Sequence, residues 1–155
     1  MTPPVRAALI DGVITHRETT TAPRAAIWAL WTDPQSWPRW EHELRSVKFP
    51  GPFEKGAKGS FKPTSGIGGD FIVRKVDDEI GYAITFQVPC GAILLERFFE
   101  DGAEDDTVFV QTVKFIGPSK NVFAAILTPY FRMSMPAAME RLKTRAEAQT
   151  ARRAA

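Results

Sequence analysis

The sequence has very few residues of the kinds that stabilise small proteins through covalent or metal cross-links. Among 155 residues there are one cysteine, Cys90, and two histidines, His16 and His42. A single cysteine excludes an internal disulfide, and so few soft ligands exclude a closed zinc site. We therefore expect no metal and no other cofactor.

Long apolar runs and blocks of one charge are also missing. No segment approaches the ~18 apolar residues of a membrane-spanning helix, and the apolar run at residues 7–10 is too short for a signal peptide. The 20 basic and 18 acidic side chains leave a net charge of +2, without the basic stripe that nucleic-acid binding needs. We expect a soluble, cytoplasmic, single-domain protein, monomeric or homodimeric, without a nucleic-acid partner or stable membrane insertion.

Tryptophan, by contrast, is concentrated in one short segment. All four tryptophans, Trp28, Trp31, Trp37 and Trp40, lie within residues 23–40. An indole buries a large apolar area and keeps one N–H that needs a partner, so the cluster suggests the wall of a binding cavity. An unusually heavy core is the alternative. We expect the first two to pack a helix onto a sheet and the last two to lie at the rim of a cavity.

The periodicity of apolar residues divides the chain into strands and helices. Residues 13–21 predict a strand, and residues 24–32 and 34–40 predict two short helices. Six further strands follow at 44–49, 58–63, 70–76, 82–88, 93–100 and 107–116. Residues 119–148 predict a long helix, in which Pro129 and Pro136 should cause a kink or a broken first half. The tail after Glu147 should fray.

Several motifs in this order resemble those of a known superfamily. They are Ala22-Pro23, Ile27-Trp28, Thr32-Asp33-Pro34, Trp37-Pro38-Arg39-Trp40, Gly51-Pro52-Phe53, Lys55-Gly56, Gly59, Phe61-Lys62-Pro63, Pro136, Leu142-Lys143 and Glu147. The chain resembles the SRPBCC superfamily of START-related lipid carriers, birch-pollen-type allergens and polyketide cyclases, and most of all its bacterial polyketide cyclase/dehydratase-like branch. These are packing and turn motifs without a catalytic signature, so whether the protein is an enzyme stays open.

The resemblance implies an α+β helix-grip fold. Its curved antiparallel seven-stranded sheet, in the order β-α-α-β6-α, wraps around a long C-terminal helix. We expect a single domain over residues 1–155, with a core at 13–148 and flexible tails. A strongly curved sheet and one helix should leave an internal cavity with mostly apolar walls.

Strand alternation indicates which polar side chains face that cavity. Residues 109, 113 and 115 are apolar, which places Gln111 on the inner face. In the preceding strand the resemblance favours an inner face that contains Arg97, whereas the opposite alternation would turn Glu96 inward. A buried guanidinium needs a carboxylate, water or an oxygen-bearing ligand. Alternatively, Arg97 faces solvent or pairs with Glu96 or Asp70 at the sheet surface.

Other titratable groups offer weaker candidates for catalysis. Glu41 and His42 follow the tryptophan segment, where they form either an acid and base at the cavity mouth or a solvated start to the next strand. His16 alternates with charged residues, which favours a structural or exposed position. Cys90 has no neighbouring base that would activate a thiol. Catalytic residues therefore remain unassigned.

The sequence thus predicts binding of a small hydrophobic or amphipathic molecule, such as a lipid, a fatty acid or an aromatic polyketide-like compound. The alternatives are a polyketide cyclase, aromatase or dehydratase, and a protein-interaction module whose cavity is incidental. The predicted ligand contacts are Trp37, Trp40, Phe61, Phe71, Ile84, Phe86, Leu95, Arg97, Phe109, Gln111, Tyr130 and Met133.

Overall fold

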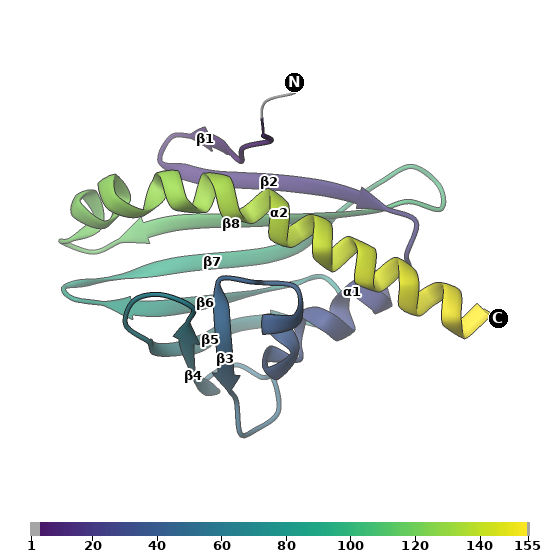
Figure 1. Ribbon diagram of the computed structural model, residues 1–155, viewed down its shortest axis with the longest axis horizontal. Coiled ribbons are helices and arrows are strands. Elements are labelled where there is room, and N and C mark those ends of the chain that lie inside the picture. The colour runs from purple at the N-terminus through teal and green to yellow at the C-terminus, as the bar shows by residue number, and fades with distance from the viewer. Residues whose placement is uncertain (1–3, 155) are drawn as a thin grey trace.

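A single antiparallel sheet with one long helix across its face makes up most of the protein (Figure 1). The computed structural model describes residues 4–154. The strands are β1 (Ala8–Ile10), β2 (Val13–Thr20), β3 (Leu44–Lys48), β4 (Lys58–Pro63), β5 (Gly69–Asp77), β6 (Gly81–Val88), β7 (Gly91–Glu100) and β8 (Thr107–Ile116). The helices are α1 (Arg24–Trp31), the 3-10 helix η1 (Pro34–Arg39) and α2 (Lys120–Ala154). The strand order β1-β2-β8-β7-β6-β5-β4-β3 confirms the helix-grip fold.

The sheet contains β1 in addition to the seven strands that the sequence predicted. Asp11 and Gly12, with φ of +51° and +77°, form the two-residue turn that brings Ile10 opposite Val13. An Asp-Gly pair is the preferred sequence for such a turn because both central residues need positive φ. The Asp-Gly pair after residues 8–10 was therefore the signal that could have predicted this strand.

The core lies between the inner face of the sheet and the helices. Buried residues alternate along β7, where Ile93, Leu95, Arg97 and Phe99 face inward and their neighbours are half-buried. This alternation confirms the inner face that includes Arg97 rather than Glu96. Trp31 is 1% exposed and stacks against the ring of Phe99 at 4.8 Å between centroids, as expected for packing α1 onto the sheet. A packed aromatic pair of this kind contributes about 0.5–1.5 kcal/mol beyond area burial.

The sequence predicted a kink or a broken first half at the prolines of the long helix, and the helix is not broken. α2 is helical from Lys120 to Ala154, so the first half is intact and the tail beyond Glu147 is helical too. Pro136 cannot donate to the carbonyl of Arg132, four residues back. The N–H of Ala7 donates to that carbonyl instead, at 2.8 Å, and Arg132 Nε donates to the Ala7 carbonyl at 2.9 Å.

The N-terminal segment thus supplies the hydrogen bond that the proline removes from α2. Ala7 is fully buried, so this exchange is shielded from water. α2 also packs against β2, β8 and α1, which holds it across one half of the sheet (Figure 1). Within the described part of the chain no helix has the length and apolarity needed to cross a membrane.

Candidate functional site

Arg97 and Gln111 meet on the inner face of the sheet. They are directly opposite each other on β7 and β8, and each is 4% exposed. Arg97 Nε donates a hydrogen bond to Gln111 Oε1 at 2.9 Å, and its guanidinium also donates to the hydroxyl of Tyr82 on β6. The alternative of an Arg97 at the sheet surface, paired with Glu96 or Asp70, is therefore wrong.

Two tryptophans from η1 and its C-terminal end enclose the guanidinium. Arg97 Cζ lies 5.1 Å from the ring centroid of Trp37 and 5.0 Å from that of Trp40. These distances are within the range of cation–π attraction. Trp37 is 2% and Trp40 0% exposed, so the expectation that they form a cavity rim is wrong. Trp37 is held in place because its Nε1 donates to the carbonyl of Trp31 at 3.0 Å.

The buried positive charge of Arg97 has no counterion in contact with it. Within residues 4–154 no carboxylate lies within 4.0 Å of the guanidinium. A second donor in the same cage, Trp40 Nε1, is buried without a hydrogen-bond partner. Burying an unpaired charge costs several kcal/mol, which hydrogen bonds and indole faces offset in part. The arrangement is suited to a ligand that carries negative charge or carbonyl oxygen.

The inner face carries a row of polar side chains across four neighbouring strands. Cross-strand pairing places His16, Gln111, Arg97 and Tyr82 in one line, from β2 across β8 and β7 to β6. His16 Nε2 lies 2.9 Å from Glu18 Oε1 at the β2 end, and β2 packs against α2. This row was not evident from the sequence, because the charged neighbours of His16 on β2 favoured a structural or exposed position for it.

Glu41 is a half-buried acid at the start of the segment between η1 and β3. Burial raises the pKa of Glu41, and the nearby positive charges of Arg97 and Arg141 oppose this increase. Burial also raises the pKa of Tyr130, with further contributions from the negative charges of Glu43 and Glu41. Glu41 is therefore near both Arg97 and Tyr130, whereas His42 is exposed.

We expect Glu41→Gln to increase the free energy of unfolding at neutral pH. Because the pKa of Glu41 is raised above its ordinary value of 4.5, the folded state holds its proton more tightly than the unfolded chain does. The carboxyl therefore lowers the free energy of unfolding as the pH rises from the pKa of Glu41 in the unfolded chain to its higher pKa in the folded state. Urea unfolding across pH should show a gain for the variant that disappears below about pH 4.

The matched control for this prediction is Glu104→Gln, at an exposed position in the β7–β8 loop. It removes the same charge without relieving burial, so its stability should follow the wild type across the pH range. A Glu41→Gln gain that persists at low pH would show that the effect comes from packing and not from protonation.

The structure places the remaining predicted contacts at different depths. Phe71, Ile84, Leu95 and Phe109 are buried on the inner face of the sheet. Phe61 and Phe86 are half-buried and pack edge to face, with centroids 5.2 Å apart. Tyr130 and Met133 are 41% and 44% exposed on α2, and as ligand contacts all of these residues remain predictions.

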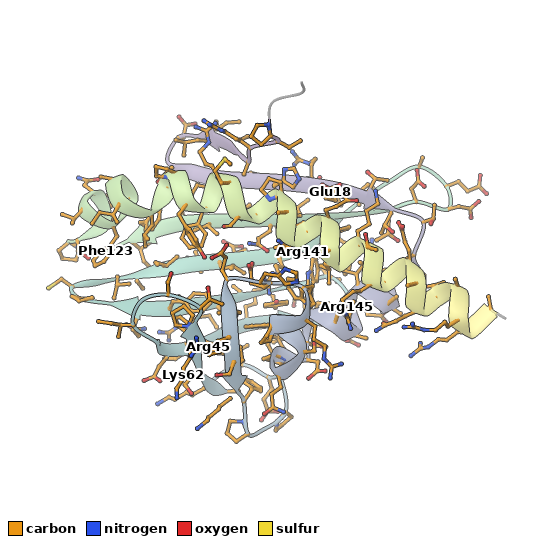
Figure 2. All side chains as sticks on the ribbon, in the orientation of Figure 1. Glu18, Arg45, Lys62, Phe123, Arg141 and Arg145 are labelled. Atoms are coloured by element: carbon orange, nitrogen blue, oxygen red, sulfur yellow. The ribbon has the colours of Figure 1, made fainter. Side chains whose placement is uncertain are left out.

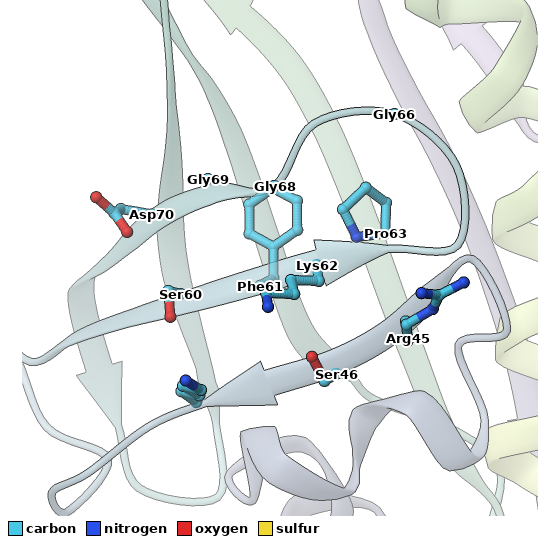
Figure 3. A pocket seen from close by; sticks show the side chains of 11 residues that line it. Arg45, Ser46, Ser60, Phe61, Lys62, Pro63, Gly66, Gly68, Gly69 and Asp70 are labelled. Carbon is cyan, nitrogen blue, oxygen red and sulfur yellow. The ribbon is translucent and has the colours of Figure 1, made fainter.

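Two pockets of about 590 Å³ each lie on the outer face of β3, β4 and β5, and Figure 3 shows the one that the β4–β5 loop borders. Neither lies between the sheet and α2, where the sequence predicted the cavity. At the inner face of the sheet, Trp31, Phe71 and Phe109 are fully buried, and Trp31 packs edge to face against Phe109. Within the described residues no three potential metal-ligating side chains come together.

Comparisons with known proteins agree with this architecture. The family model described as polyketide cyclase/dehydrase and lipid transport matches residues 12–147. No curated protein matches by sequence. A structure of norcoclaurine synthase from Thalictrum flavum in complex with dopamine and hydroxybenzaldehyde is 16% identical, with a TM-score of 0.67 over 88% of this chain and 86% of that one.

Two further solved structures share the fold at lower identity. A hypothetical protein from Helicobacter pylori is 8% identical, with a TM-score of 0.72 over 94% of this chain and 98% of that one. Ara h 8.0201 is 11% identical, with a TM-score of 0.69 over 88% of this chain and 97% of that one. Identities this low establish the fold and leave the chemistry to the residues of this chain.

Proposed function

The chain belongs to the polyketide cyclase/dehydrase and lipid transport family of the SRPBCC superfamily, and from that premise we propose that it binds a small amphipathic molecule between the sheet and α2. The apolar part of the ligand lies against the aromatic side chains of β4 to β6. Its oxygen-bearing end, a carboxylate, phenolate or carbonyl, accepts hydrogen bonds from Arg97.

The single observation that carries this proposal is the buried guanidinium, which no carboxylate of residues 4–154 contacts. Gln111 and Tyr82 orient it, and Trp37 and Trp40 fix it from η1. An arginine needed for stability alone would gain more from a carboxylate partner, because the pair neutralises the buried charge. A ligand oxyanion supplies the same neutralisation reversibly, and charge-assisted hydrogen bonds are roughly twice as strong as neutral ones.

Entry to the site is easiest beneath the first half of α2. There the apolar side chains Phe123, Leu127 and Phe131 are only half-buried, as are Phe61 and Phe86 on the strands. Phe123 lies at the end of α2 that is far from α1 (Figure 2). Partly exposed side chains can move aside at a lower cost in free energy than fully packed ones. The region beneath the first half of α2 is therefore the one that opens for a ligand.

A second candidate function is proton-transfer catalysis of the cyclase type, and one observation favours it. Glu41 is half-buried with a raised pKa near Arg97. A carboxyl tuned in this way exchanges protons near neutral pH more readily than an ordinary one, while a guanidinium stabilises the oxyanion that forms. The similar norcoclaurine synthase binds dopamine and hydroxybenzaldehyde, which are aromatic compounds with oxygen substituents of this class.

The experiment that tests the proposal is native mass spectrometry of protein purified from its own host, followed by extraction and identification of bound molecules. We expect a stoichiometric ligand with an apolar body and an acidic or carbonyl group. Protein that carries no such molecule, and that binds no member of a panel of fatty acids and hydroxylated aromatics, would contradict ligand binding.

A further inference from the structure

The outer face of the sheet carries a groove whose polar lining has no part in the proposed function. It consists of the two pockets of about 590 Å³ on β3, β4 and β5, which share Lys48, Ser60 and Asp70 in their lining. Ser60 alternates with the buried Gly59 along β4, so the groove lies on the opposite face from the core. The polar lining of the groove and Arg97 therefore lie on opposite faces of the sheet, although Phe61 and Phe71 also border the pockets.

Short side chains form the floor of the groove and long basic ones form its walls. Cross-strand pairing places Ser60 between Lys48 on β3 and Asp70 on β5, and it places Ser46 opposite Lys62. Figure 3 shows Ser46 and Ser60 between the longer side chains, with the glycine-containing β4–β5 loop at one end. Ser46 and Ser60 are half-buried between longer side chains, which leaves a depression with hydroxyl groups at its floor.

The charges around this depression are strongly unbalanced, although the whole chain is nearly neutral. Arg45, Lys48, Lys58 and Lys62 line it and are all exposed, against the single carboxylate of Asp70. None of these four forms a salt bridge with another described residue. Unpaired cations around a concave surface attract anions more strongly than the same charges on a flat one.

We propose that this groove binds a phosphate-bearing anion with two or more negative charges. Phosphate oxygens accept several hydrogen bonds at once, which suits a site that offers ammonium, guanidinium and serine hydroxyl donors together. The pockets have the size of a small-molecule site. The phosphate belongs either to a soluble ester or to a lipid headgroup, and Ile67, 95% exposed in the adjoining loop, would contact the acyl chains in the second case.

Isothermal titration with sodium tripolyphosphate tests the soluble source, and sedimentation with phosphatidylcholine vesicles containing a phosphatidylinositol phosphate tests the lipid source. The double variant Lys48→Ala/Lys62→Ala should weaken the binding that is observed by roughly tenfold or more, because each lost charge-assisted hydrogen bond weakens it severalfold. The matched control Lys114→Ala/Lys120→Ala removes two exposed charges elsewhere on the surface and should leave binding nearly unchanged.

Each outcome decides the proposal. Binding of tripolyphosphate that depends on Lys48 and Lys62 supports a soluble ester. Binding of phosphoinositide vesicles alone, weakened by the same double variant and by Ile67→Ser, supports a lipid headgroup. The proposal is overturned if neither probe binds. It is also overturned if the control variant loses as much affinity as Lys48→Ala/Lys62→Ala, since the loss would then come from the lower net charge and not from the groove. None of these results depends on Arg97.

Discussion

Replacing Arg97 with methionine is expected to weaken binding of the anionic fluorophore 8-anilinonaphthalene-1-sulfonate by roughly tenfold or more, because a charge-assisted hydrogen bond contributes about 1.5–3 kcal/mol. Binding of the neutral analogue N-phenyl-1-naphthylamine should be nearly unchanged. The two probes share an apolar aromatic body and differ in charge. Fluorescence titration of both probes therefore separates the contribution of the guanidinium from that of the surrounding aromatic side chains.

Folding should survive this substitution, because methionine is flexible and fills irregular apolar space. The variant also removes a buried charge that has no carboxylate in contact with it. Arg97→Lys is the informative second variant: it keeps the charge but loses the planar group that donates to both Gln111 and Tyr82. We expect it to bind the anionic probe with intermediate affinity. Equal affinity of all three proteins for that probe would show that Arg97 does not contact the ligand.

The strand pattern could be predicted from the sequence because alternation on a half-buried sheet is strict. A shift of one residue would move every inner side chain to the outside, so the apolar neighbours of Gln111 determined its orientation. The resemblance to a known family then decided the orientation of Arg97, for which alternation alone was ambiguous. Both side chains are buried and hydrogen-bonded to each other.

The tryptophan cage could not be predicted in the same way. Its geometry depends on how η1 packs against β3, which is a tertiary contact between segments without a shared periodicity. The sequence predicted Trp37 and Trp40 as ligand contacts, which stays a prediction, and it placed them at a rim because nothing in the local pattern shows that Arg97 approaches their rings. The space expected to be hollow is lined with large aromatic side chains for the same reason. The volume of each side chain follows from the sequence, but the way in which side chains together fill the interior does not.

The intact α2 shows how a local rule can be overridden by a distant contact. A proline inside a helix leaves one carbonyl without its partner, and a buried unpaired carbonyl costs about 1–3 kcal/mol. The helix itself was therefore expected to kink or to break in its first half. Instead the N–H of Ala7 reaches the Arg132 carbonyl, so that the partner comes from a segment 125 residues away in sequence.

Ala7→Pro is accordingly expected to lower the free energy of unfolding by about 1–3 kcal/mol, because it removes the N–H donor and leaves the Arg132 carbonyl unpaired. Urea denaturation measures the effect. Val5→Pro is the control in the same segment, since Val5 is 65% exposed, and it should cost much less. Similar losses for the two variants would indicate a general intolerance of proline at the N-terminus and not the loss of one hydrogen bond.

A double-mutant cycle with Pro136→Ala makes this argument specific. Alanine at position 136 has an N–H that can donate to the Arg132 carbonyl within the helix, so the carbonyl no longer depends on Ala7. Ala7→Pro should then cost less in the Pro136→Ala background than in the wild type, by about 1 kcal/mol, the net contribution of one such hydrogen bond. An equal cost in both backgrounds would mean that Ala7 stabilises the protein through its burial alone, and that α2 tolerates Pro136 without help from the N-terminal segment.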